Sequence, residues 1–380
     1  MLDTLAWPKV KDLAASTVVG SGSSQRVCPG ASGTEVLIVG NGSVLHRSTN
    51  SGVSFSNAGI GLPSGGAILA QLGEANLWNS SFGDILWDPV SSTYCLLVAA
   101  FGGDGAGNDN SKIQLWSSAD FVTWTHRWAV VTIPGANYSG NYTEWNTGMR
   151  LTRDASGACW LSTGNGPLYK KASGAAINTS ATWTQVNPSG GAPAAGDPTR
   201  FQILPNGVFV WWQGAMTVGQ FYTSADGVTW ALRTKSSPGN NFGMAAVFGS
   251  TYAVFFCNTV SGSQVGSIFT TADFVTWTQV NIGGLTAFNG LFADSVGFTV
   301  WYSATRKLFQ SSTLTSWDEQ AAPNNPQKFD TWFKVGAHIY GTSPNGSSST
   351  NMYQFTQTTQ YRVPTLAAMT PTLVPFFKAK

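Results

Sequence analysis

The amino-acid sequence predicts an all-β protein built from repeated units, and three observations support this fold class. A seven-residue phrase, Ser/Thr-Ala-Asp-Gly/Phe-Val-Thr-Trp, occurs at 118–124, 224–230 and 271–277, with degenerate copies at 48–55, 180–183 and 312–317. Glu is rare in the chain, so long amphipathic helices are not expected. Val, Thr and aromatic residues between Gly, Ser and Asn clusters indicate many short strands. Such self-similarity indicates one supersecondary unit stacked on copies of itself.

Each unit follows one order of elements, which is clearest in the middle of the chain. Strands are expected at 201–205 and 208–212 around an Asn206–Gly207 turn, then at 221–223 and, after the repeated phrase, at 229–233. The following units repeat this order at 244–280 and 291–317. Four antiparallel strands in a unit of about 45 residues are typical of a β-propeller blade.

The number of units predicts the number of blades. The phrase or a remnant of it marks six units, and a seventh, at 329–363, has the expected strands without it. We therefore predict a seven-bladed β-propeller with four antiparallel strands per blade, and six blades are the main alternative. The predicted domains are an N-terminal arm at 1–15, the propeller at 16–363 and an apolar, Pro-rich C-terminal extended arm at 364–380.

The repeated phrase has a mechanical interpretation. Ser and Asp oxygens accept backbone N–H groups in tight turns, and Gly supplies a backbone position with positive φ. The Trp is expected to begin the outer strand and to pack between blades. We therefore assign structural roles to Ser118, Asp120, Trp124, Trp183, Ser224, Asp226, Gly227, Trp230, Asp273, Trp277 and Trp317.

These phrases resemble the Asp-box (BNR) repeats of sialidase-like propellers. They are still more similar to the short Ser-x-Asp-Gly-x-Thr-Trp form seen in bacteriophage virion and tail proteins. The resemblance covers about residues 15–363 and implies a fold rather than a chemistry. Sialidases of this family use a Tyr nucleophile, a carboxylate partner and three Arg. No matching set occurs in this chain, and Tyr361-Arg362-Val363-Pro364, which is similar to an element preceding the first box in the family, follows the last unit instead.

The long insertions predict a binding face. The repeated phrase joins the third and fourth strands of a unit, whereas the insertions at 59–79, 101–112, 130–146, 187–198 and 260–264 fall on the opposite face. Elaborate loops on a rigid scaffold are common binding sites, and aromatic rings beside amides suit sugars. The alternative is that these rings fix long loops to the scaffold. The predicted ligand-binding residues are Trp78, Tyr138, Tyr142, Glu144 and Trp145.

Few residues indicate catalysis or metal binding. Glycoside hydrolysis needs two carboxylates near a pocket, and Glu144 is the best single candidate, with Asp84, Asp104 or Asp109 as its partner. The Gly-rich stretch around Asp104 and Asp109 has oxygen ligands that suit Ca²⁺, but a single copy in imperfect register favours a plain loop. We therefore predict a protein without catalytic residues, metal or other cofactor. The four cysteines are expected to be buried and not disulfide-bonded.

Composition narrows the partners and the location. The formal net charge is +2 with scattered Lys and Arg, which does not indicate nucleic-acid binding. No apolar run suits membrane insertion, and the first residues do not resemble a secretory signal. A low-charge chain rich in Gly, Ser, Thr, Asn and Trp is similar to bacteriophage virion proteins.

These observations predict a non-catalytic virion protein of a tail, fibre or surface decoration. It would be made in the host cytoplasm and act extracellularly. Its arms would contact other virion proteins, and its looped face would bind a host surface glycan or receptor. The alternatives are a purely structural virion protein, a glycan-cleaving or sialidase-like enzyme, and a secreted adhesin.

Overall fold

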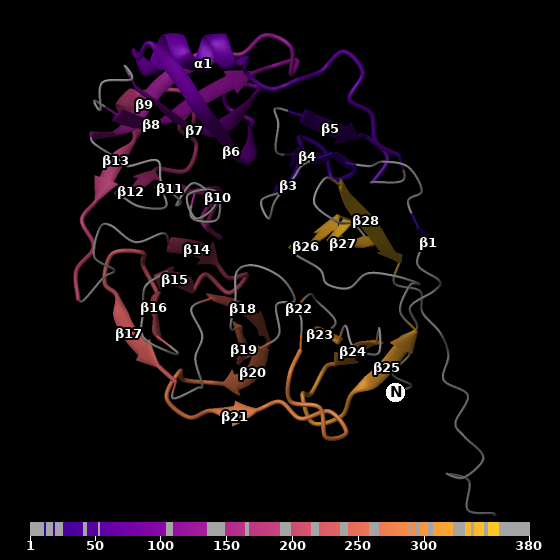
Figure 1. The fold of residues 1–380 in the computed structure, drawn as a ribbon. Helices are drawn as coiled ribbons and strands as arrows, with labels where there is room; N and C mark the ends of the chain where they lie inside the picture. Colours follow the sequence, from indigo (N-terminus) through magenta and orange to yellow (C-terminus); the bar gives the residue numbers. More distant parts are fainter. Residues whose placement is uncertain are drawn as a thin grey trace, which may run out of the picture.

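Seven antiparallel sheets follow one another around a ring in the part of the chain that the computed structural model describes (Figure 1). This arrangement confirms the predicted seven-bladed β-propeller. The described residues are 11–12, 18–19, 26–40, 44–51, 54–103, 109–134, 149–163, 167–190, 199–213, 220–235, 242–257, 266–288, 290–293, 297–302, 307–321, 331–335, 338–345 and 349–356.

Five of these sheets have four strands each, in chain order from the centre of the ring outward (Figure 1). The second sheet contains β6 (Asn76–Asp88), β7 (Thr93–Gly103), β8 (Asp109–Ser118) and β9 (Thr125–Pro134). The third contains β10 (Met149–Arg153), β11 (Cys159–Thr163), β12 (Leu168–Lys171) and β13 (Thr184–Val186). The fourth contains β14 (Thr199–Ile203), β15 (Phe209–Gln213), β16 (Gln220–Ser224) and β17 (Ala231–Thr234). The fifth contains β18 (Phe242–Phe248), β19 (Thr251–Cys257), β20 (Gly266–Thr271) and β21 (Thr278–Gln279). The sixth contains β22 (Gly290–Ala293), β23 (Phe298–Tyr302), β24 (Lys307–Ser311) and β25 (Asp318–Ala321).

The first and last sheets depart from this plan. The first contains β3 (Arg26–Pro29), β4 (Val36–Gly40) and β5 (Val44–Ser48), and an isolated bridge between Arg47 and Ser56 stands where other sheets have a fourth strand. The last contains β26 (Thr331–Val335), β27 (His338–Asn345) and β28 (Ser349–Thr356). Two short N-terminal strands, β1 (Lys11–Asp12) and β2 (Val18–Val19), complete it.

The pairing of β1 and β2 with β28 closes the ring. Lys11 stands opposite Gln354, and Val18 stands opposite Thr350, so the two ends of the chain share one sheet. The predicted boundary of the N-terminal arm at residue 15 falls between these two strands. The predicted C-terminal arm at 364–380 lies outside the described residues.

The hydrophobic core lies between consecutive sheets. Each of five clusters joins two neighbours; Leu97 of β7 and Leu161 of β11, for example, belong to the cluster between the second and third sheets. Because each sheet packs on two others, both of its faces are apolar. The thiols of Cys28, Cys95 and Cys159 are buried and not disulfide-bonded, as expected from the sequence, and the side chain of Cys257 lies outside the described residues.

A recurring hydrogen bond connects the inner strands of neighbouring sheets. A side chain on one inner strand accepts a backbone N–H group from the inner strand of the next sheet. The N–H groups of Ile85, Leu151 and Ala245 donate to Cys28 Sγ, Asp84 Oδ2 and Gln202 Oε1, at 3.3, 3.0 and 3.2 Å. All three donors occupy the same register position in their sheets. The bond therefore fixes how far one sheet is shifted along its strands relative to the next.

The repeated turns are held by the Ser and Asp side chains of the phrase. Ser224 Oγ accepts the N–H groups of Asp226 and Gly227 at 3.2 and 2.8 Å. Asp226 Oδ1 accepts those of Val228 and Thr229 at 2.8 and 2.7 Å. The same bonds occur at 118–123 and 271–276. These aspartates therefore act as acceptors within the turns.

The fourth position of the phrase differs from the sequence-based expectation. Gly227 has positive φ, but so do Phe121 and Phe274, with φ near 60°. Phe121 is buried, with its ring centroid 4.2 Å from that of Tyr94. At Gly227 there is no room for such a ring, because the indole of Trp160 from the neighbouring sheet packs against the glycine. A Cβ on Gly227 would lie 2.4 Å from this indole. A left-handed backbone costs about 1–2 kcal/mol, which burial of a Phe ring offsets.

This arrangement predicts different outcomes for two glycine substitutions. Gly227→Ala and Gly207→Ala both place a side chain at positive φ, but a Cβ at Gly207 would meet open space. We expect Gly207→Ala to lower the free energy of unfolding by about 1–2 kcal/mol. Gly227→Ala should lower it by a further 1–3 kcal/mol, about the cost of overpacking a core. Urea unfolding of both variants measures the difference, and equal losses would contradict the proposed contact with Trp160.

A second prediction concerns acid stability. Backbone N–H groups, that of Thr229 first, lower the pKa of Asp226 from 3.8 to about 2. Because the pKa is lower in the folded state, the carboxylate stabilises the fold above pH 3.8, and this contribution is lost as the pH falls toward 2. Asp226→Asn keeps an acceptor oxygen but does not titrate. Its free energy of unfolding should fall less steeply than that of the parent between these pH values, and an unchanged slope would refute the assignment.

Candidate functional site

The second sheet is longer than the others and projects on the side away from the repeated turns. Its strands have 13, 11, 10 and 10 residues, whereas those of the third and fourth sheets have three to five. Five additional residues correspond to about 16 Å of strand. The repeated turn at 119–124 lies at one end of this sheet, and the projection forms the other end, on the face where binding loops were predicted.

The helix α1 (Gly65–Leu72) packs on the projecting strands (Figure 1). Ser64 Oγ accepts the N–H of Ala67 at 3.2 Å, and Gly73, with φ of 77°, ends the helix. Ile68 and Leu72 are buried in the core between the first two sheets. Sequence reasoning predicted a long loop in this region and missed α1. The signal was an N-cap Ser and a C-cap Gly around a short apolar run.

Two side chains of β8 hold α1 through its carbonyl groups. Lys112 Nζ donates to the carbonyls of Gln71 and Leu72, and Gln114 Nε2 donates to that of Ile68 at 3.4 Å. A lysine at this position is favourable, because a helix C-terminus carries a partial negative charge. Asn110 Nδ2 donates to Glu74 just beyond the helix. The projection is therefore a packed unit rather than a loose insertion.

Trp78 lies on the projecting part of β6, where the β6–β7 register is interrupted by a bulge between Leu77 and Asn79. Its side chain is 38% exposed, which is unusual for a Trp in a described sheet of this chain. Part of this residue is therefore in contact with solvent.

The other predicted ligand-binding residues belong to the loop that follows β9. Tyr138, Tyr142, Glu144 and Trp145 lie outside the described residues. This loop leaves the sheet after Pro134, which stands opposite Asn110, which in turn stands opposite Gly102. The start of the loop is therefore at the same height as Trp78, three strand spacings or about 14 Å away.

The acidic residues considered for catalysis or Ca²⁺ binding are not gathered in the described part of the chain. Asp84 accepts the N–H of Leu151 at 3.0 Å and forms an ion pair with Arg150 at 3.2 Å. Asp104 lies outside the described residues, and Asp109 begins β8 without a described side chain. Among the described residues no group of three or more His, Cys, Asp or Glu could hold a metal ion.

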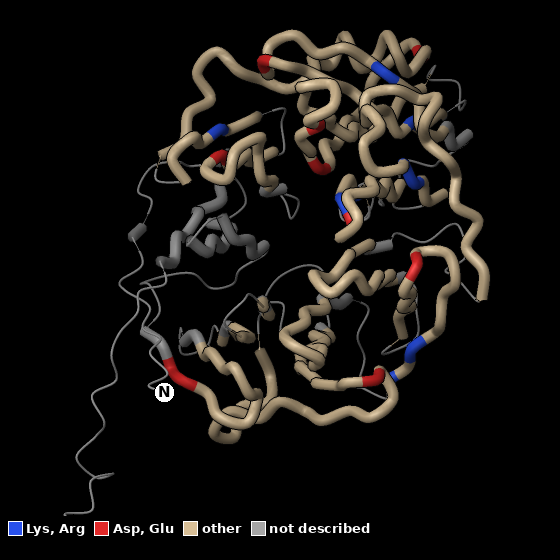
Figure 2. Tube along the Cα trace, turned by 180° about the vertical axis from the view of Figure 1, so that it is seen from behind, with Lys and Arg blue, Asp and Glu red and all other residues tan. Residues whose placement is uncertain are grey.

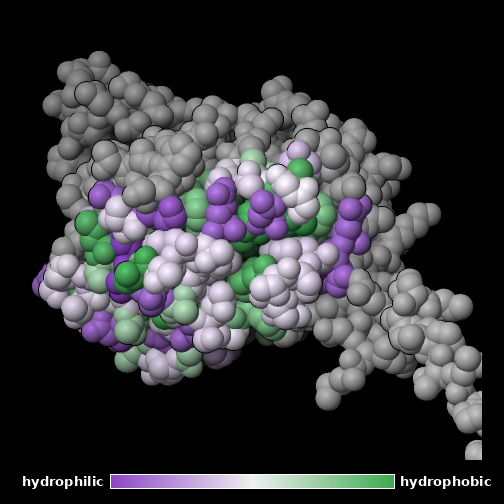
Figure 3. Space-filling model, turned by 90° about the horizontal axis from the view of Figure 1, so that it is seen from below, coloured by the Kyte–Doolittle hydropathy of each residue, from purple (hydrophilic) through white to green (hydrophobic). Residues whose placement is uncertain are grey.

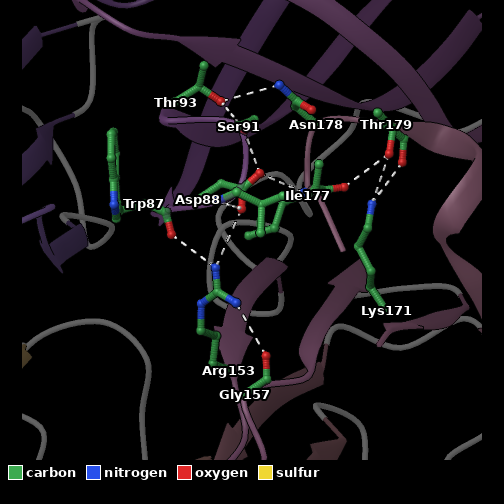
Figure 4. Close-up of polar contacts among 12 residues, drawn as sticks. Trp87, Asp88, Ser91, Thr93, Arg153, Gly157, Lys171, Ile177, Asn178 and Thr179 are labelled. Carbon is green, nitrogen blue, oxygen red and sulfur yellow. Dashed lines mark hydrogen bonds and ion pairs between the residues drawn. The ribbon is translucent and has the colours of Figure 1, made fainter. Parts of the chain in front are cut away.

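A buried ionic cluster lies at the opposite end of the second and third sheets (Figure 4). Asp88, which is fully buried, accepts the N–H of Ile177 at 2.8 Å and the hydroxyl of Ser91 at 2.5 Å. Arg153 Nη2 lies 3.8 Å from Asp88 Oδ1 and donates to the carbonyl of Trp87 at 3.2 Å. The cluster thus joins the first turn of one sheet to the degenerate repeat of the next.

Lys171 replaces the Ser of the repeated phrase in the third sheet. It pairs with Cys159 in the row where Ser224 pairs with Phe209. Its side chain is buried, and Nζ donates to the carbonyl of Thr179 at 3.0 Å (Figure 4). Burial lowers the pKa of Lys171.

The two thiols of this region are poor nucleophiles. Burial raises the pKa of Cys95 to about 12 and that of Cys159 to about 11, so neither forms a thiolate at neutral pH. The polar groups of the cluster bond to one another and to backbone, which is the arrangement of a structural support.

Two substitutions in the cluster should change the free energy of unfolding by very different amounts. Asp88→Ala leaves the Ile177 N–H and the Arg153 guanidinium without their buried acceptor, so we expect a loss of about 3–5 kcal/mol in the free energy of unfolding. Lys171→Met replaces a buried ammonium by an apolar chain of similar length, and we expect a change below about 1.5 kcal/mol. Urea denaturation tests both, and a large loss in Lys171→Met would show that its bond to Thr179 holds the turn.

The described surface carries few charges. Lys, Arg, Asp and Glu are scattered around the ring in Figure 2, and hydrophobic residues form separate patches among hydrophilic ones in the view of Figure 3. Val122 and Val275, at the tips of two repeated turns, are among the most exposed apolar side chains. Within the described residues, no helix has the length and apolar character needed to cross a membrane.

Comparisons with known proteins establish the fold alone. No protein-family model and no curated protein matches the sequence. A virginiamycin B lyase from Staphylococcus aureus, solved with quinupristin, has a TM-score of 0.54 at 8% identity over 92% of this chain and 98% of the lyase. YCF48 bound to D1 peptide has a TM-score of 0.54 at 11% identity over 93% and 96%. YCF48 from Cyanidioschyzon merolae has a TM-score of 0.51 at 9% identity over 92% and 98%.

Proposed function

We propose that this β-propeller is a non-catalytic binding protein of a bacteriophage particle. Its ligand is a host surface glycan or receptor, recognised by the projecting end of the second sheet. The observation that carries this proposal is the exposed Trp78 on a projection that α1 and β8 hold rigid. A rigid aromatic platform loses little conformational entropy when a ligand stacks on it.

In the part of the chain that the structure describes, the buried carboxylates have structural partners. The most buried carboxylates, Glu35, Asp84 and Asp88, each accept bonds from neighbouring backbone or side chains. Arg47 and Tyr94 both donate to Glu35, which joins the first two sheets. A glycoside hydrolase would need a pair of carboxylates facing a substrate.

The structural neighbours do not select a ligand. One is solved with quinupristin and another with a peptide, and these ligands are chemically unrelated. A fold is compatible with many functions, so the proposal depends on the projecting end and its aromatic residues. The virion role depends on the resemblance of the repeated phrase to bacteriophage propellers and on the low-charge composition.

Glycan binding is tested by substitution of the exposed ring. Trp78→Ala should lower affinity for the host polysaccharide about tenfold, which corresponds to about 1.4 kcal/mol of lost stacking. Trp145→Ala should have a similar effect if its loop contributes to the same site. Val275→Ser, on the face of the repeated turns, is the matched control and should bind normally. Unchanged binding in both Trp variants would remove the site assignment.

Two further measurements separate the proposal from its rivals. Release of reducing ends from host polysaccharide, abolished by Glu144→Gln, would identify a glycosidase instead. Detection of the chain in purified particles by mass spectrometry is expected, and its absence would refute the virion role. Presence in particles without binding to host cells would favour a purely structural virion protein.

A further inference from the structure

The face of the repeated turns carries most of the exposed large apolar side chains in the part of the chain that the structure describes. Six such side chains are exposed there and elsewhere, and four of them lie in turns at this face, namely Val90, Val122, Val228 and Val275. The turn of Val90 joins β6 to β7 at the end where Tyr94 stands opposite Ser118, the first residue of a repeated phrase. Of the other two, Trp78 lies on the projection and Leu232 on β17. One face of the ring is therefore unusually apolar.

The same group of side chains is exposed at three of these turns. The Ala, Asp, Val and Thr of the phrase are exposed at 119–123, 225–229 and 272–276, in the second, fourth and fifth sheets. Backbone N–H groups, those of Thr123 and Thr276 first, lower the pKa of Asp120 and Asp273, so these carboxylates are ionised at neutral pH. A partner on this face therefore meets a valine beside a carboxylate at three places around the ring.

Both ends of the described chain also lie at this face. The turn between the first and second strands of a sheet lies at the same end as its repeated turn, as between β14 and β15. In the seventh sheet this turn joins β26 to β27 before His338, and Thr356, at the end of β28, stands opposite His338. Lys11, at the start of β1, stands opposite Gln354 near that end. The residues that precede β1 and follow β28 are therefore joined to the ring at the face of the repeated turns.

We infer that the propeller is mounted on another protein of the particle through the face of the repeated turns, an inference that rests on the proposed virion role. The partner surface is apolar and carries Lys or Arg, which match the valines and the carboxylates beside them. The predicted arms, which are expected to contact other virion proteins, start at this face, so the proteins they hold lie on the same side. The projecting end of the second sheet, with Trp78, is then on the side away from the particle.

Cysteine labelling of purified particles tests this orientation. Val275→Cys and Ala75→Cys place an exposed thiol on either side of the ring, since Ala75 is exposed at the start of the projection. In the free chain both variants should react with a polyethylene-glycol maleimide at similar rates, above the background that the parent chain sets. In particles we expect Val275→Cys to react about tenfold more slowly, because the core of an interface excludes water, and Ala75→Cys to stay within about twofold.

The possible results separate the orientation from the proposed function. Equal slowing of the two variants in particles, or none in either, would overturn the orientation and leave the virion role intact. Slow reaction of Val275→Cys in the free chain would show that the chain's own ends or a second copy cover the turns, and would also overturn the inference. Absence of the chain from particles would overturn the proposed function and the inference with it.

A second pair of variants tests whether the valines make the contact. Val275→Asp should lower the number of copies per particle several-fold, because it replaces an apolar contact by a further carboxylate. Leu232→Asp makes a similar chemical change at an exposed apolar residue of an outer strand and should be incorporated normally. Urea unfolding of the free variants checks that each still folds. Equal incorporation of the two variants would refute the role of the repeated turns in attachment.

Discussion

Each sheet buries both of its faces against its neighbours, and this requirement governs the rest of the structure. A sheet at the end of an open stack would leave one apolar face in water, so the stack must close on itself. The closing contact is the pairing of β1 and β2 with β28, which joins the two ends of the chain in one sheet. The stability of every blade therefore depends on pairing between residues at least 330 positions apart.

Around the ring, specific polar groups set how neighbouring sheets meet. Apolar packing alone tolerates sliding, whereas a buried N–H group must find an acceptor in one place. The N–H groups of Ile85, Leu151 and Ala245 find theirs on the preceding inner strand. The Asp88 cluster likewise connects the second and third sheets at their turns. The degenerate repeat of the third sheet lacks the Ser and Asp acceptors of the repeated phrase, and the Asp88 carboxylate accepts the N–H group of Ile177 there.

The sequence allowed the blade count, the repeated turns and the start of the outer strand in the second to sixth sheets to be predicted, because these depend on local residue patterns. Three features escaped prediction because they depend on partners outside the repeated pattern. Ring closure joins β1 to β28, Lys171 is held by a loop of its own blade, and the positive φ of Phe121 is offset by rings of other strands. Of the predicted binding residues, Trp78 is described and exposed, while the other four stay predictions.

The same constraint explains why one sheet can depart from the plan. The part of a strand that extends past the neighbouring sheets has no sheet packed against it, so its apolar side chains need another element to cover them. In the second sheet α1 supplies that cover: Ile68 and Leu72 continue the core, and Lys112 and Gln114 satisfy the carbonyls that the helix would otherwise expose. Trp78 stands on this covered projection and is partly exposed to solvent, and an aromatic residue in such a position is suited to recognition.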